Sequence, residues 1–447
     1  MEKTRESWGS RFGFIMATAG FAIGLGAIWR FPYMVGVNGG GAFLIVYIIL
    51  SAVIGIPLFI AEVTLGRKTQ KGPILGMRDL TKKGSPWRVI GWLGGIASLM
   101  IMSYYVVILG WMVAYLVKMI TGEFAGASTV QIQAIYSSFT SNMPQVTFYT
   151  ILVTILLGII VTRGLKDGIE KYCKVLMPAL FVLLIVLAVK SLLLPGAMEG
   201  VKWYLTPDFS KINGQVILAA LGQAFFAIGI GVATAFIYGS YLERGKSSIP
   251  SDSSIIVLAN TMIAIVAGLI IFPAIFSLGL SPDSGPGLVF VTMPNLFAQM
   301  TGGRIFGIMF FFLVVIAGLT SGMGYLEAVA VCISEIFNID RKKSTLVALG
   351  TILLMSILPI LSYGPLKDVL IGGRNFFDLA DFLSGNVLMP VGALIISLYT
   401  AFVWKFKNYK EEANLGCGKF RIYNWWKPVV VFVIPVAVAV IMVTGLI

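Results

Sequence analysis

Eleven apolar segments, each long enough to cross a lipid bilayer as a helix, dominate this sequence of 447 residues. A bilayer core about 30 Å thick needs roughly 20 apolar residues in a helix. Charged residues make up only 12% of the chain, against roughly 25% in an average soluble domain. We therefore expect an all-α, multi-pass membrane protein. The expected spans are 12–36, 42–66, 89–121, 146–162, 174–196, 214–242, 254–280, 304–336, 345–363, 376–404 and 426–447.

Basic residues gather on one side of these spans. With the N-terminus inside, 25 of the 33 Lys and Arg residues fall in cytoplasmic segments, as the positive-inside rule requires. The net charge of +13 is thereby explained by the lipid bilayer as partner, and nucleic acid is not expected. Residues 1–11 precede an apolar segment without an evident cleavage site, which favours a first span over a removable signal peptide. A short re-entrant hairpin is expected outside, at 281–303.

Several chemistries are excluded by what the chain lacks. It contains no histidine, and its three cysteines (Cys173, Cys332 and Cys417) show no CxxC spacing. Histidine acid–base catalysis, imidazole ligation and a cysteine zinc site are therefore not expected. Neither an HExxH motif nor a pair of membrane aspartates is present, so an intramembrane protease lacks its parts. We expect no enzyme.

Paired glycines interrupt the first and the sixth span. GFAIGLGAIWRFP contains Gly24 and Gly26, and GQAFFAIGIGVATA contains Gly229 and Gly231. Close helix packing would explain either pair alone. Two interrupted helices at matching positions of two halves instead indicate a transport site near the middle of the membrane. Unwound backbone there must line a cavity or bind something, and its free N–H and C=O groups suit a carboxylate and a cation.

These residues carry a family resemblance. The motifs AIGLGAIWRFPYMVGVNGGGAF, SYYVVILGW, GQAFFAIGIG, AGLTS and DLADF resemble those of bacterial members of the neurotransmitter:sodium symporter family, similar to the leucine and multi-hydrophobic amino-acid transporters. The resemblance implies the leucine-transporter-like fold, a 5+5 inverted repeat of about eleven helices with helices 1 and 6 broken. It divides the chain into residues 1–196, 197–404 and 405–447.

The resemblance implies an intact second sodium site. Helix 1 carbonyls and helix 8 oxygens would form it, a hard oxygen cage of the kind that suits sodium. Alternatively, the two helix 8 hydroxyls bond back to their own helix. The residues are Gly20, Ile23, Ala317, Thr320 and Ser321.

The first sodium site is expected to be degraded. The family supplies side-chain oxygens where this chain has Ala27 and Ala227, leaving Ala22 and Asn260. The chloride-type positions are similarly depleted, since Ala227 and Ala264 lack hydroxyls beside Tyr47, Gln223 and Asn260. Losing a buried cation together with its counter-charge avoids two large penalties. We expect coupling to one sodium, without chloride.

A neutral apolar or aromatic L-amino acid is the expected substrate. Gly24 stands where monoamine members carry an aspartate, and its lack of a carboxylate favours a substrate that brings its own. Tyr105 would donate a hydrogen bond to that carboxylate. Alternatively, Tyr105 is an interfacial or packing residue. Gly229 and Val232 are small and would leave room for the substrate side chain on the helix 6 side. In helix 1, Phe21 stands where the family commonly has a polar residue. The resemblance implies these pocket residues: Ala22, Gly24, Gly26, Ile101, Tyr105, Phe226, Ala227, Gly229, Val232, Ser321 and Tyr325.

The resemblance also implies two gates and a hinge. Arg30 would pair with Asp381 outside, above Phe226 and Tyr105. Gly168 and Pro178 have the spacing of the family's helix 5 unwinding motif, although a glycine cap followed by a proline is an alternative. The inner gate would pair Arg5 with Glu335, helped by Trp8 and Tyr241.

Three alternatives to this symporter stay open from the sequence. A channel would have to explain paired gates on both faces, which favour alternating access. The solute could be another small zwitterion or anion. A sensor could use the same fold without transport. The localisation expected is the bacterial inner membrane with the N-terminus in the cytoplasm, and the oligomeric state does not follow from the sequence.

Overall fold

Each of the eleven expected spans contains helix in the computed structural model, which describes residues 5–277, 279, 288–416, 418 and 420–446. Within that part, eight helices are each long and apolar enough to cross a membrane, and a ninth span is a helix pair bent by 49°. The helices found within the eleven expected spans are, in order, α1 and α2 (Arg11–Ala22, Phe31–Val37), α3 and α4 (Gly41–Leu50, Ile56–Thr69), α6 (Val89–Thr121), α8 (Met143–Thr162), α9 (Lys171–Leu192), α11 and α12 (Gly214–Ile228, Thr234–Ser240), α13 (Ile249–Ser277), α15 (Gly303–Phe337), α16 (Arg341–Leu361), α17 and α18 (Phe376–Phe382, Met389–Leu398) and α20 (Ile434–Leu446).

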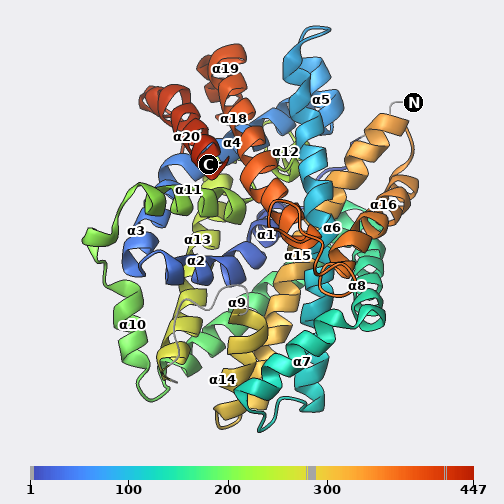
Figure 1. Cartoon of the computed structure of the whole chain (residues 1–447). Helices are drawn as coiled ribbons and strands as arrows, with labels where there is room; N and C mark the ends of the chain where they lie inside the picture. Colours follow the sequence, from blue (N-terminus) through green and yellow to red (C-terminus); the bar gives the residue numbers. More distant parts are fainter. Residues whose placement is uncertain (1–4, 278, 280–287, 417, 419, 447) are drawn as a thin grey trace.

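Short helices cover the two ends of the bundle. Figure 1 shows α5 and α19 at one end and α7, α10 and α14 at the other. Of the hairpin expected at 281–303, residues 288–299 are helical, while 281–287 lie outside the described residues. The short helices are α5 (Pro73–Leu80), α7 (Thr129–Ser141), α10 (Ala197–Leu205), α14 (Met293–Gln299) and α19 (Lys405–Ala413).

Helix 1 breaks between α1 and a π-helical turn, Gly26–Arg30, that leads into α2. Ile23 ends α1 with a non-helical backbone (φ −82°, ψ 66°). The Cβ of any side chain at Gly24 would lie 2.2 Å from the Ser321 hydroxyl oxygen of α15. Glycine is therefore required at this position for space, and the break brings the helix 1 backbone directly against α15.

Helix 6 breaks between α11 and α12 for a conformational reason. Gly229 and Gly231 have φ angles of +72° and +87°, which cost glycine little and other residues more. The N–H of Gly231, which has no partner within a helix, donates to the buried Glu62 carboxylate of α4 at 2.7 Å. A carboxylate buried in a membrane helix thus holds the unwound segment, which has no water to bond.

The two breaks meet in the centre of the bundle. α1 packs against α9, α12, α13 and α15, and α6 runs along α15; Figure 1 shows α1 among these helices. Every substrate-pocket residue expected from the sequence lies on α1, α6, α11, α15 or a break.

Helix 5 differs from the expected unwound form. It runs without interruption from a π-helical start, Leu165–Glu170, through α9, and Pro178 lies inside α9. A Cβ on Gly168 would lie 2.2 Å from the Ile160 carbonyl oxygen of α8. Close packing explains this glycine here, and unwinding is not present in this conformation.

Candidate functional site

Some residues of the expected second sodium site lie together. The Ser321 hydroxyl donates to the carbonyls of Gly20 and Phe21 at 3.2 and 2.7 Å. A hydroxyl that donates its proton keeps lone pairs with which to coordinate a cation. Ser321 therefore joins α15 to the end of α1, as the sodium-ligand interpretation requires.

The Thr320 hydroxyl bonds within its own helix, as the alternative to a sodium ligand predicts. It donates to Ile316 and Ala317 carbonyls of its own helix at 3.2 and 3.0 Å, the usual pattern for threonine in a membrane helix. Its Cβ nevertheless faces α1, since it lies 3.0 Å from a Cβ placed on Gly20. The donated proton points toward a carbonyl that belongs to the same expected ligand set, Ala317.

At the first sodium position, the two residues expected to lack a side-chain oxygen lie in the core. Ala27 and Ala227 are both buried and apolar. The Gln223 amide donates to the Gly26 carbonyl at 2.8 Å. The Asn260 amide is fully buried, and neither its nitrogen nor its oxygen has a hydrogen-bond partner in the described part of the chain.

Other polar groups without partners lie near Asn260. The Tyr47 hydroxyl lies beside Ser51, Thr261 and Asn260, and neither it nor the Ser51 hydroxyl has a hydrogen-bond partner among the described residues. Buried polar groups of this kind are normally satisfied by water or an ion. Ser51 was not identified from the sequence.

Several residues of the expected substrate pocket lie close together. The Tyr105 hydroxyl donates to the Gly318 carbonyl at 3.1 Å and would lie 3.6 Å from a Cβ on Gly24, so it reaches the break of helix 1. A Cβ on Gly26 would lie 3.0 Å from the Phe226 ring. Ser98 donates to the Val232 carbonyl and so fixes the helix 6 break from α6.

The expected room at Gly229 is filled. The ring of Phe21 lies where a Gly229 side chain would be, 2.6 Å from an added Cβ. Phe21 also packs edge to face on Tyr325, with ring centroids 5.0 Å apart. The expectation of free space on the helix 6 side was therefore wrong at Gly229, because the side chain of a neighbouring helix occupies it.

The outer gate does not contain the expected ion pair in this structure. Among the described residues, Arg30 and Asp381 form no ion pair with a nitrogen–oxygen distance within 4.0 Å. Instead the Arg30 guanidinium lies 4.3 Å from the Phe226 ring centre. Arg30, Gln223 and Asn386 line a cavity of about 330 Å³ here. Cation–π attraction holds Arg30 over the Phe226 ring. The pairing of Arg30 with Asp381 stays a prediction for a closed state.

At the expected inner gate, Trp8 and Arg5 contact partners that the sequence did not indicate. The Trp8 indole donates to the Tyr238 carbonyl at 2.9 Å. Arg5 donates to Ser240 and lies over the Tyr241 ring rather than forming an ion pair with Glu335. Glu335 instead accepts the Ile74 and Leu75 N–H groups at 3.0 and 3.1 Å.

A buried ion pair lies behind this gate. Arg341 of α16 pairs with Glu327 of α15 at 2.6 Å and with Glu6 at 3.1 Å. Tyr241 also donates to Glu327. Acidic residues within an apolar span are functional candidates by default, and by that signal Glu327 could have been identified.

Glu170, also missed from the sequence, fastens helix 1 to helix 5. This carboxylate is buried, accepts the Gly9 N–H at 2.7 Å and the Ser10 hydroxyl at 3.0 Å, and pairs with Lys174 at 2.6 Å. It lies so close to Gly13 that a Cβ there would be 2.0 Å away. Opening the inner side therefore requires these bonds to separate.

We predict that E170Q loosens this contact, because the neutral amide replaces one of the two accepting carboxylate oxygens by an NH2 group, which cannot accept a hydrogen bond from Gly9 or Ser10. Hydrogen bonds to charged groups contribute about 1.5–3 kcal/mol each. Losing one should let helix 1 separate from helix 5 more often and expose Cys173 of α9, which is buried here. Cys173 should therefore react at least tenfold faster with a thiol reagent. The measurement uses a C332S/C417S background. D79N is the control, since Asp79 forms an exposed ion pair with Lys71; equal rates in all variants would contradict the prediction.

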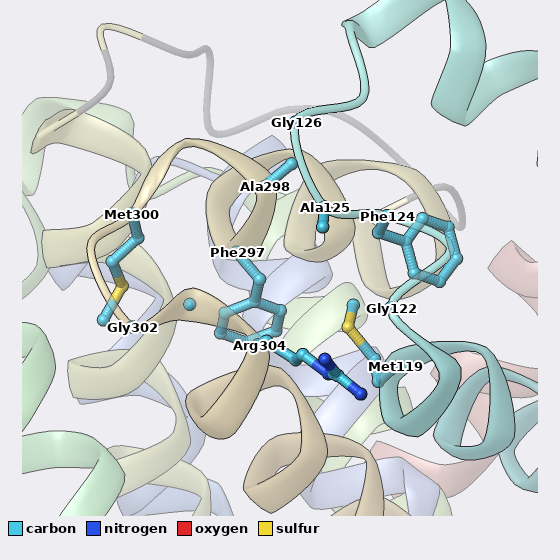
Figure 2. A pocket seen from close by; sticks show the side chains of 11 residues that line it. Met119, Gly122, Phe124, Ala125, Gly126, Phe297, Ala298, Met300, Gly302 and Arg304 are labelled. Atoms are coloured by element: carbon cyan, nitrogen blue, oxygen red, sulfur yellow. The ribbon is translucent and has the colours of Figure 1, made fainter.

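A separate cavity lies at the end of the bundle that carries α7 and α14. Figure 2 shows Arg304 pointing toward Met119 and Gly122 in a cavity of about 230 Å³ between the end of α6 and the corner before α15. None of the residues expected to bind sodium or substrate lines it. We assign it no role in transport.

Comparisons with known proteins agree with this arrangement. Residues 5–134 and 128–447 match the model of the sodium:neurotransmitter symporter family. An uncharacterized sodium-dependent transporter of Bacillus subtilis is 40% identical over 445 residues, covering 98% of this chain and 97% of the relative. One from Haemophilus influenzae is 36% identical, covering 99% of both chains.

A solved structure has the same fold. The crystal structure of MhsT in complex with L-phenylalanine is 39% identical in sequence and covers 99% of this chain and 100% of its own, with a TM-score of 0.90. The all-α fold with broken helices expected from the sequence is thus confirmed.

Proposed function

We propose a substrate and a coupling ratio for this chain, which belongs to the sodium:neurotransmitter symporter family and is a sodium-dependent symporter. It imports a neutral apolar or aromatic L-amino acid by alternating access, together with one sodium ion at the second site and without chloride. The N-terminus lies in the cytoplasm and the protein in the bacterial inner membrane. L-Phenylalanine in MhsT supports an amino acid as the substrate.

One observation carries the coupling ratio: the two sodium positions differ in their oxygens. At the second, Ser321 already joins α15 to two helix 1 carbonyls. At the first, Ala27 and Ala227 offer methyl groups. We infer that water rather than an ion satisfies Asn260, Tyr47 and Ser51, because no sodium beside them would balance a chloride.

One sodium is sufficient for accumulation. A tenfold gradient contributes about 1.4 kcal/mol, and 100 mV acting on one charge contributes about 2.3 kcal/mol. The two contributions sum to about 3.7 kcal/mol, which could concentrate a neutral amino acid on the order of 500-fold.

The test is sodium-driven uptake into proteoliposomes. We expect labelled amino-acid uptake to rise with sodium with a Hill coefficient near one, and replacement of chloride by gluconate to leave it unchanged. A coefficient approaching two would contradict the single site. Loss of uptake in gluconate would show that Tyr47, Ser51 and Asn260 hold chloride instead of water.

A further inference from the structure

We propose that Phe21 determines the size of the substrate side chain and restricts this transporter to small apolar L-amino acids. This proposal rests on the proposed amino-acid transport and narrows its substrate. Phe21 is the penultimate residue of α1, directly before the break, and its side chain is 2% exposed.

The Phe21 ring fits between two glycines on different helices. A Cβ added to Gly229 in the helix 6 break would lie 2.6 Å from two ring carbons, and one added to Gly324 of α15 would lie 2.5 Å from another. Neither glycine could carry a side chain without displacing the ring. The ring therefore occupies the space that the absence of both side chains creates.

The ring also supports an aromatic wall of the pocket. It packs edge to face on Tyr325, with ring centroids 5.0 Å apart and an angle of 74° between the planes, and more distantly on Tyr238 at 6.3 Å. Tyr325 in turn lies 5.6 Å from the ring of Tyr105. Phe21 thus fixes Tyr325 against the tyrosine expected to bind the substrate carboxylate.

These contacts leave the substrate side chain little space to expand. Its expected walls include the bulky, buried Ile101 and Tyr325, and the glycine wall on helix 6, Gly229, has Phe21 directly behind it. Because protein interiors are closely packed, an aromatic substrate side chain would have to displace this ring. A methyl or isopropyl side chain would not.

Replacing Phe21 should therefore change which substrate is preferred. A single methylene changes discrimination by about 10- to 200-fold in a hydrophobic pocket. We expect the wild type to prefer L-alanine or L-valine to L-phenylalanine. F21A should raise kcat/KM for L-phenylalanine relative to L-alanine by at least tenfold, with a smaller shift in F21L.

The experiment measures sodium-driven uptake of both amino acids by the full-length protein in proteoliposomes. F43A is the matched control, because Phe43 of α3 is equally buried and packs on Phe31 rather than on the breaks. F43A should lower the yield of folded protein and leave the substrate ranking unchanged. Should F21A be too unstable to transport, the ranking is read from ligand-induced thermal shifts of F21L.

Each outcome has a distinct meaning. A wild type that transports L-phenylalanine better than L-alanine, or an unchanged ranking in both Phe21 variants, would overturn the role of Phe21 while leaving amino-acid transport in place. A wild type that accumulates no amino acid in a sodium gradient would overturn the proposed function itself. A ranking change of equal size in F43A would show a general packing effect and would also refute the proposal.

Discussion

Replacing Ser321 by alanine is expected to abolish sodium-driven uptake at moderate sodium concentrations. The substitution removes one oxygen of the expected cage and the donor shared by the Gly20 and Phe21 carbonyls. A hydrogen bond or ligand to a charged partner contributes about 1.5–3 kcal/mol. The sodium concentration for half-maximal uptake should therefore rise roughly 10- to 150-fold.

The controls separate sodium binding from general damage. T320S keeps a hydroxyl at the neighbouring position and should stay close to wild type. S356A removes a buried hydroxyl of α16 that bonds only within its own helix, to Leu353, and should leave sodium dependence unchanged. An S321A protein with wild-type sodium affinity would disprove the role of the second site.

The spans could be predicted because their signal is local. Apolar length marks a membrane helix without any knowledge of its neighbours, and Gly24, Gly26, Gly229 and Gly231 mark the two breaks. The structure adds different physical reasons for these glycines. Gly24 is needed because Ser321 lies against it, whereas Gly229 and Gly231 are needed for their positive φ angles.

The contacts across the bundle could not be predicted in the same way. Glu170 bonds residues 160 and 161 positions earlier in the chain, and no local pattern links them. The direction of the Phe21 ring depends on space left by Gly324, which lies even farther away in the sequence. The expected Arg5–Glu335 and Arg30–Asp381 pairs are not formed in this conformation, in which Arg5 contacts the Tyr241 ring and the Ser240 hydroxyl and Arg30 lies over the Phe226 ring.

The largest effect on conformational balance is expected from R341M. Glu327 is 1% exposed and its pairs with Arg341 and Tyr241 close the inner side between α15, α16 and the residues after α12. Breaking a buried ion pair by removing one partner costs about 3–5 kcal/mol. Part of that cost is relieved when the inner side opens to water, so R341M should favour the inward-open state by more than about 100-fold.

Measured uptake should accordingly fall at least tenfold in R341M, while sodium-independent efflux of preloaded amino acid rises. The double variant R341M/E327M removes both charges, and it should recover much of the uptake, because an apolar pair carries no unpaired buried charge. K343M is the control in the same segment, since Lys343 is exposed and pairs weakly with Asp340 at 3.6 Å. If R341M and the double variant transport equally poorly, the guanidinium acts through something other than the charge of Glu327, and the gate would have to be assigned to Arg5, Trp8 and Tyr241 alone.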